Sequence, residues 1–406
     1  MTTTTHENLL NQVLDYTNRA DPYPIYARMR EHPVWVQEDG RFIVSTYAEV
    51  RACLQDPRFS SDLRKGYSQA DQRTDKEEEV PPSLTRLDPP KHDWLRHQVM
   101  PHFSPELISG LRPRIAEVAR ALLDAGAERT RLDIVDDFAY PLPVTIICEV
   151  LGVPREDVTL FQTWVDQLLL AIDPEQAANK EVAQQATSAR AELRHYMGRL
   201  IDQLQRTPGP GLISAMLHDT TQEKHMTREE LVTISVLLLL AGHLTTVNLI
   251  ANSMLTLLRY PEHYERLRRE PSIVANLVEE VLRYEPPVQF VRRTTLTEVP
   301  IAGVTIPKGA PVYLMLAAGN RDPLRFDDAD RFDPARPDIE HLGFGQGIHY
   351  CVGAPLARLE TQIALPELAR RLQDPRLVED PPPYREGLRL RGPRHLVVSL
   401  HSDISV

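Results

Sequence analysis

The segment from residue 227 to residue 258 places the tightest limit on the fold of this chain. It is apolar almost all round, and Thr227 and Glu230 have the spacing of a capping box, which predicts a helix on the order of 45 Å long. His243 and Asn248 interrupt the apolar sequence too soon for a membrane span. A helix that is apolar all round and outside a membrane must be buried, so other elements have to surround it.

The rest of the chain predicts mostly helices, with a small β region and no alternation of strands and helices. We therefore expect a mainly α fold in one domain over residues 1–406, with residues 1–20 as a flexible N-terminal segment. Further helices are expected at 47–55, 105–127, 141–151, 155–172, 176–205, 272–285 and 355–371, a hairpin at 34–45, and short strands between 299 and 316 and near 388–400.

Charge and cysteine content exclude several classes of protein. The net charge of −11 argues against nucleic acid as a partner, because phosphate neutralisation needs a basic surface. Three cysteines cannot all pair, which favours a reducing compartment over a disulfide framework. The N-terminus has no basic region followed by an apolar run, so we expect neither a signal peptide nor a membrane anchor, and a cytoplasmic protein.

The loop from Phe344 to Gly353 is the richest in chemistry. It contains Cys351 among several glycines, and glycine permits positive φ and close approach of the backbone. A helix is expected to start just after it, with Pro355 in its first turn. The positive end of that helix would favour a thiolate at Cys351, which could be a ligand or a nucleophile.

Three other short patterns are weak when taken singly. His92 and Arg96 share one helix face, and Glu280 and Arg283 are three residues apart, which by itself fits a surface ion pair. Thr245, in the middle of the long helix, could divert its hydroxyl to a backbone carbonyl, but on the helix alone simple packing is the better explanation.

Taken in order, these pieces resemble the cytochrome P450 monooxygenases over roughly residues 20 to 400. The glycine-rich loop resembles the haem-binding signature, Glu280 to Arg283 the Glu-x-x-Arg helix, Arg331 to Asp333 its partner segment, and Ala241 to Thr246 the oxygen-binding part of the central helix. The resemblance implies the P450 fold of the soluble bacterial type, with a long central helix across the haem and the cysteine loop on its proximal side.

The resemblance also implies a role for each matched residue. Cys351 would be the axial thiolate ligand of haem b, and Glu280, Arg283 and Arg331 a buried structural network. The residues that would hold the cofactor are His92, Arg96, Arg293, Phe344, Gly345, His349, Cys351 and Gly353.

On the distal side the resemblance implies catalytic positions at Ala241, Gly242, Leu244, Thr245 and Thr246. The family usually has Asp or Glu where this chain has Leu244, as one station of a proton path to dioxygen. Three explanations stay open: His243 substitutes, ordered water or a polar substrate group relays protons, or the chemistry needs less proton delivery.

The substrate is expected to be a lipophilic small molecule, in secondary-metabolite biosynthesis by analogy. Loop 60–85 and the helices around 165–180 would form a lid. A ferredoxin or flavodoxin with its NAD(P)H reductase would supply electrons to a monomer. The pocket positions implied by the family are Val236, Leu237, Leu240, Val288, Gln289, Phe290, Val291 and Leu390.

The implied activity is hydroxylation or epoxidation with dioxygen. A peroxide-using or oxidative-coupling variant of the same fold is the nearest rival, favoured by Leu244. A non-catalytic haem protein is opposed by Thr245. A zinc site at His349 and Cys351 is the weakest alternative, because no second Cys/His pair has metal-ligand spacing.

Overall fold

A single long helix runs through the middle of the molecule. The computed structural model describes residues 8–66, 81–127, 129–170, 179–220 and 224–400, and in it α13 (Arg228–Arg259) spans 32 residues. The predicted capping box is present, because Thr227 and Glu230 exchange both of its hydrogen bonds. α13 is long and apolar enough to cross a membrane, yet 67% of its most apolar window is buried inside the protein, as a core helix requires.

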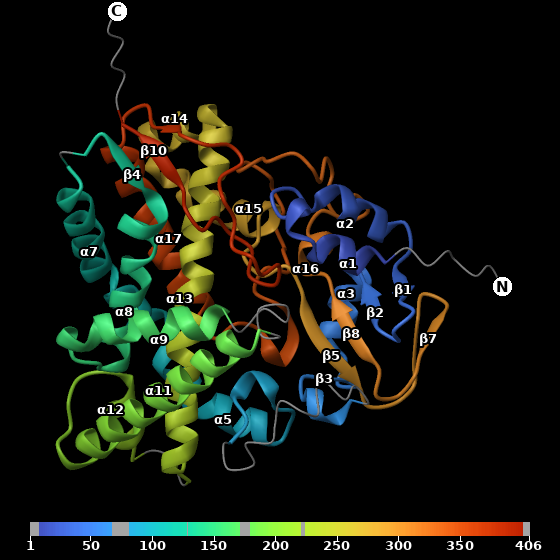
Figure 1. The fold of residues 1–406 in the computed structure, drawn as a ribbon, viewed down its shortest axis with the longest axis horizontal. Coiled ribbons are helices and arrows are strands. Elements are labelled where there is room, and N and C mark those ends of the chain that lie inside the picture. The colour runs from blue at the N-terminus through green and yellow to red at the C-terminus, as the bar shows by residue number, and fades with distance from the viewer. Residues whose placement is uncertain (1–7, 67–80, 128, 171–178, 221–223, 401–406) are drawn as a thin grey trace, which may run out of the picture.

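Helices cover α13 on most sides and form the larger part of the protein (Figure 1). α8, α11, α15 and α17 all pack against it, and they share one large hydrophobic core. The predicted helix at 105–127 is interrupted at Leu111, and α14 was not predicted. The other described α-helices are α1 (Leu9–Leu14), α2 (Tyr23–Arg30), α3 (Tyr47–Gln55), α5 (Lys91–Val99), α6 (Pro105–Gly110), α7 (Arg112–Ala125), α8 (Pro141–Leu151), α9 (Val158–Leu170), α11 (Lys180–Arg206), α12 (Leu212–Leu217), α14 (Pro261–Arg269), α15 (Val274–Tyr284), α16 (Leu316–Gly319) and α17 (Ala354–Arg371).

The β region lies to one side of the helices (Figure 1). Its main sheet has the order β1-β2-β8-β5-β3, in which β2 and β8 are parallel and the other pairs antiparallel. The predicted hairpin is confirmed as β1 and β2. The described strands are β1 (Val34–Val36), β2 (Phe42–Val44), β3 (Phe59–Ser60), β4 (Arg131–Asp133), β5 (Val291–Thr295), β6 (Val299–Ile301), β7 (Val304–Ile306), β8 (Pro311–Leu314), β9 (Arg376–Leu377) and β10 (Val397–Ser399).

The N-terminal segment corrects one prediction. Residues 8–20 are not flexible: α1 buries Leu9, Leu10 and Val13 completely, in a cluster shared with α2 and the β region. Burial of these side chains offsets the conformational entropy of ordering the segment. Of the residues assigned to the lid, 67–80 and 171–178 lie outside the described residues.

Candidate active site

The loop before α17 is held in one conformation by its own backbone. Gly345 and Gly347 have φ of +71° and +69°, a region that disfavours side chains, and a Cβ on Gly347 would come within 2.6 Å of the Leu54 carbonyl oxygen of α3. The backbone N–H of Cys351 donates to the carbonyl of Phe344 at 3.0 Å and closes the loop. These contacts fix the position of the Cys351 side chain.

Cys351 differs from the other two cysteines in its surroundings. Cys53 and Cys148 are buried, whereas the surface of Cys351 is accessible. The protein around the thiol is still dense, so burial raises the pKa of Cys351, while hydrogen bonds from the backbone N–H groups of Gly353 and Ala354 act to lower it. Arg96 and Arg358 add positive charge nearby. The sulfur thus has donors and cations that favour its ionised form once a partner compensates for burial.

Three basic side chains from distant parts of the chain gather beside His349 of this loop. His92, on α5, and His349 lie with ring centroids 4.4 Å apart. Arg96, one turn after His92, donates to the carbonyl of Tyr350 at 2.8 Å. Arg293, on β5, is buried, and burial lowers its pKa to about 10. The structure therefore brings together four residues that the sequence placed near one cofactor.

Glu280 and Arg283 form a buried pair on α15. Both side chains are fully buried, and the guanidinium donates to the carboxylate with its Nε and Nη2 atoms at 2.7 Å each. Arg283 also donates to the carbonyls of Asn320, Ala329 and Arg331. Such a pair is bidentate and fully desolvated, so it holds α15 to the irregular segment before the cysteine loop.

The sequence predicted Arg331 as the third member of this network, and for its side chain this prediction is wrong. The side chain of Arg331 is 68% exposed, and only its backbone carbonyl contacts Arg283. The guanidinium that reaches Glu280 belongs to Arg336, whose Nε lies 3.6 Å from the carboxylate. At Arg331 the backbone carbonyl, and not the side chain, contacts Arg283, so the guanidinium is left at the surface. Both residues are arginines in one loop, so spacing alone did not separate them.

Three of the five predicted catalytic positions on α13, Ala241, Gly242 and Thr245, lie on its accessible stripe. Between Leu231 and Leu257 the helix is buried except at Leu237, Leu240, Ala241, Gly242 and Thr245. Leu237, Ala241 and Thr245 recur four residues apart on one face, and Leu240 and Gly242 flank them on its two sides. Thr245 donates its hydroxyl to the Ala241 carbonyl at 2.8 Å, and Thr246 to that of Gly242 at 3.3 Å. The helix continues through both threonines.

Leu244 and His243 are both buried, although Leu244 is on the same helix face as Leu237 and Leu240. Leu244 is 4% exposed and packs in the main core. His243 is fully buried against the ring of Tyr140, with centroids 4.4 Å apart, and burial together with the charge of Arg385 lowers its pKa to about 3. A residue two positions after Ala241 points about 200° away from it around the helix. His243 is therefore neutral and poorly placed to replace the acid.

The implied pocket positions divide into two groups. Val288, Val291 and Leu390 are partly accessible, and Val288 pairs with Leu390 in an isolated bridge. Gln289 and Phe290 point elsewhere, which corrects their assignment: Gln289 is bonded to Tyr26 and the Pro286 carbonyl, and Phe290 packs in the N-terminal cluster. Val236 is also buried in the main core, because it lies off the stripe of α13.

Comparisons with known proteins agree with this geometry. The sequence profile of the family described as Cytochrome P450 matches residues 32–394. This chain belongs to the cytochrome P450 family. It is 40% identical to the cytochrome P450 monooxygenase PikC of Streptomyces venezuelae, over 91% of this chain and 90% of PikC. It is 38% identical to mycinamicin IV hydroxylase/epoxidase of Micromonospora griseorubida, over 88% and 89% of the two chains.

A solved structure shows the same fold. Mycobacterium smegmatis CYP164A2 with econazole bound superposes with a TM-score of 0.88 at 40% identity, covering 96% of this chain and 99% of that one. The chain is thus a P450 monooxygenase with the P450 fold, and the family implies haem with thiolate ligation and the use of dioxygen. P450s of this kind also bind small molecules and take electrons from redox partners.

The residues present fit a haem. Nε2 of His92 and Nε2 of His349 are buried without a hydrogen-bond partner. Burial, together with the charges of Arg293, His92 and Arg96, lowers the pKa of His349 to about 3, against an opposing effect of Asp88. Among the described residues, no carboxylate forms an ion pair with Arg96 or Arg293. This surplus of donors and positive charge matches the two propionates of a haem.

A second ion pair near the loop was not predicted. Arg358, on α17, donates from Nε and Nη2 to Glu279 of α15 at 2.6 and 2.8 Å, and from Nη1 to the Tyr350 hydroxyl at 3.0 Å. Its guanidinium carbon lies 4.5 Å from the centre of the Phe344 ring. Arg358 therefore ties the cysteine loop to α15. The only signal in the sequence was an arginine one turn into the helix that follows the cysteine.

Proposed function

We propose that this chain hydroxylates or epoxidises a lipophilic small molecule in secondary-metabolite biosynthesis. It would work as a cytoplasmic monomer of one domain, with haem b, dioxygen and electrons from a ferredoxin or flavodoxin and its NAD(P)H reductase. The observation that carries the proposal is the accessible stripe of α13, on which an apolar face of Leu237 and Leu240 leads directly to the Thr245 hydroxyl.

Each group of residues beside the cysteine loop would have a different role in holding the cofactor. When bound, haem supplies the activation of dioxygen. Cys351 would hold the iron as a thiolate, stabilised by the N–H groups of Gly353 and Ala354. His92, Arg96, Arg293 and His349 would bind the propionates and so hold the cofactor in the site.

Thr245 and its apolar neighbours would act on the other face. The hydroxyl of Thr245 can turn from the Ala241 carbonyl and hold or pass a proton at Oγ1, because it is on the accessible stripe. Leu237 and Leu240, with Val288 and Leu390, would exclude water and orient an apolar substrate.

The names of the relatives support the type of reaction. PikC is named a monooxygenase, and the mycinamicin enzyme a hydroxylase and epoxidase. An apolar stripe interrupted by one hydroxyl suits lipophilic substrates, which are recognised mainly by shape and apolar contact.

The test is turnover in a reconstituted system. The haem-loaded protein is first titrated in the ferric state with macrolide, terpenoid, peptide and fatty-acid compounds, to find those that displace water from iron. Each binder is then incubated with ferredoxin, reductase and NADPH. We expect NADPH consumption that depends on the compound and a product heavier by one oxygen atom. Absence of both for every binder would contradict the proposal.

A peroxide-using variant is a second candidate, and Leu244 favours it. Leu244 is buried, and leucine cannot relay a proton, so the usual acid is missing from the proton path. Product formed with hydrogen peroxide, and none with ferredoxin and NADPH, would support this alternative.

Substitution of Leu244 separates the two candidates. An acid at this position would be buried and have a raised pKa, so Leu244→Glu should improve coupling with NADPH only if proton supply is limiting. Leu244→Gln has a similar size without the charge and is the matched control. Unchanged turnover and coupling in both variants would show that position 244 has no role in catalysis.

A further inference from the structure

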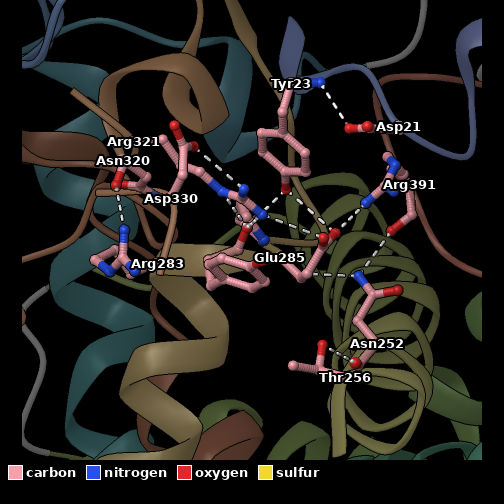
Figure 2. A network of polar contacts seen from close by, with 12 residues as sticks. Asp21, Tyr23, Asn252, Thr256, Arg283, Glu285, Asn320, Arg321, Asp330 and Arg391 are labelled. Atoms are coloured by element: carbon pink, nitrogen blue, oxygen red, sulfur yellow. Dashed lines mark hydrogen bonds and ion pairs between the residues drawn. The ribbon is translucent and has the colours of Figure 1, made fainter. Parts of the chain in front are cut away.

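Behind the pocket, a carboxylate whose side chain is only 14% exposed joins four separate parts of the chain. Glu285 follows α15 directly, and its carboxylate accepts hydrogen bonds from the Tyr23 hydroxyl at 3.2 Å, from Arg321 at 3.3 Å and from Arg391 (Figure 2). The guanidinium of Arg321 lies between the rings of Tyr23 and Tyr284, at 3.4 and 3.6 Å from their centres. None of these groups reaches the cysteine loop, so the cofactor does not explain them.

Arg391 is the central cation of this network. It is 1% exposed, and besides Glu285 it donates to the carbonyls of Arg19 at 2.8 Å and Ala20 at 2.7 Å. A buried guanidinium with this many partners has little freedom to move. The backbone of residue 391 is thereby fixed to the end of α15 and to the N-terminal segment.

Two backbone hydrogen bonds hold two pocket segments, residues 287–289 and 389–391, side by side. The N–H of Arg391 donates to the Pro287 carbonyl at 2.8 Å, and the N–H of Gln289 to the Arg389 carbonyl at 3.1 Å. Between these two hydrogen bonds, Val288 is opposite Leu390. Both side chains are only partly buried, in contrast to Arg391 and Asn252 behind them, which are buried.

Two asparagines of α13 connect this arrangement to the stripe. Asn252 donates from Nδ2 to the carbonyls of Glu285 and Arg391, at 3.1 and 3.2 Å, as Figure 2 shows. Asn248 donates to the Leu390 carbonyl at 3.3 Å. Asn248 is three residues after Thr245, so Leu390 is held within about one turn of the stripe.

We propose that Glu285 and Arg391 are positioning residues for substrate selection: they set the distance of the wall formed by Val288 and Leu390 from the stripe of α13. This inference rests on the proposed function, which makes that wall part of the substrate pocket. The network would then select ligands by size and shape, with no contact to them.

The test compares a ligand that reaches the wall with one that does not. The ferric, haem-loaded protein is titrated with imidazole, which occupies only the position on iron, and with econazole, whose aromatic arms fill the space around it. Glu285→Gln, which leaves Arg391 without its anion, should weaken econazole binding about tenfold and change imidazole binding less than twofold. Asp380→Asn is the control, because Asp380 pairs with Arg259 at the surface near the same loop.

A second variant keeps the test open if Glu285→Gln does not fold. Asn248→Ala removes the bond to Leu390 without leaving a buried charge, and should weaken econazole binding severalfold, again without an effect on imidazole. Equal changes for both ligands, or no change for either, would overturn the inference. Econazole binding to the unsubstituted protein no tighter than imidazole would also overturn it, whereas the proposed function is judged separately by turnover.

Discussion

The two sides of the haem site are built in different ways. On the cysteine side, backbone hydrogen bonds, glycines with positive φ and two ion pairs of α15 determine nearly every position. On the α13 side, a few accessible side chains on the helix form the site. Few of them make hydrogen bonds outside their own helix. The first side can therefore change little without loss of the cofactor, whereas the second can change residue by residue with the substrate.

Removal of the thiol should have the largest effect. Cys351→Ser should lower turnover by roughly 100-fold or more, about 3 kcal/mol or more in the barrier, because the thiolate ligand is lost. The reduced carbon monoxide complex should lose its thiolate-type Soret band. Cys148→Ser, at a buried position of α8, is the control and should keep both. Retention of the band in Cys351→Ser would refute the ligand assignment.

The buried ion pair should come next, with an effect on stability. Arg283→Met leaves the Glu280 carboxylate buried and short of partners, which typically costs about 3–5 kcal/mol in the free energy of unfolding. Arg331→Ala should change that free energy by less than about 0.5 kcal/mol, since its side chain is at the surface.

Urea unfolding of the haem-loaded variants measures these differences. Arg336→Ala should be destabilised more than Arg331→Ala, because Arg336 is the arginine whose side chain approaches Glu280. The reverse order would show that the side chain of Arg331 belongs to the network.

The pair of Glu279 with Arg358 should give the cysteine side a dependence on pH. Burial acts to raise the pKa of Glu279, but hydrogen bonds from Arg358 and His341 outweigh it and lower the pKa to about 2. In the unfolded chain the carboxyl of Glu279 has a pKa of about 4.3, so the unfolded state takes up the proton first as the pH falls. Stability from this group is therefore complete above about pH 5 and is lost towards pH 2, by about 2 kcal/mol after solvent screening.

Unfolding measured at several pH values checks this sign. Glu279→Gln should flatten the profile between about pH 5 and pH 2. Asp124→Asn removes a carboxylate that pairs with Arg371 and is 69% exposed, and should leave the profile as it is. An identical slope in the Glu279 variant and the unsubstituted protein would contradict the assignment.

The smallest effect is expected from the two threonines of α13. Thr245→Val should lower the product formed per NADPH consumed by about tenfold, equivalent to about 1.4 kcal/mol. Thr246→Val should be close to neutral in this ratio, since Thr246 is 3% exposed and lies off the stripe. Equal losses in both variants would mean that the accessible stripe does not mark the catalytic face.

The sequence predicted what depends on local pattern. α13, its capping box and the Cys351 loop each follow from residues close together in the chain, so their prediction needed no knowledge of distant contacts. The choice between Arg331 and Arg336 depended instead on which of two nearby arginines faces α15. The directions of Gln289 and Phe290 depended on the register of a strand against the N-terminal cluster. No local pattern contains this information, because partners from remote segments decide it.

The basic cluster beside Cys351 also sets the order in which this protein can mature. Arg96 and Tyr350 are joined by a hydrogen bond, yet 254 positions separate them in the chain. Synthesis proceeds from the N-terminus, so α5 leaves the ribosome long before the cysteine loop exists. The complete cofactor site can form only when nearly all of the chain has been made. Haem therefore has to be captured by an almost finished polypeptide, and a cell that makes the chain faster than it makes haem will accumulate apoprotein.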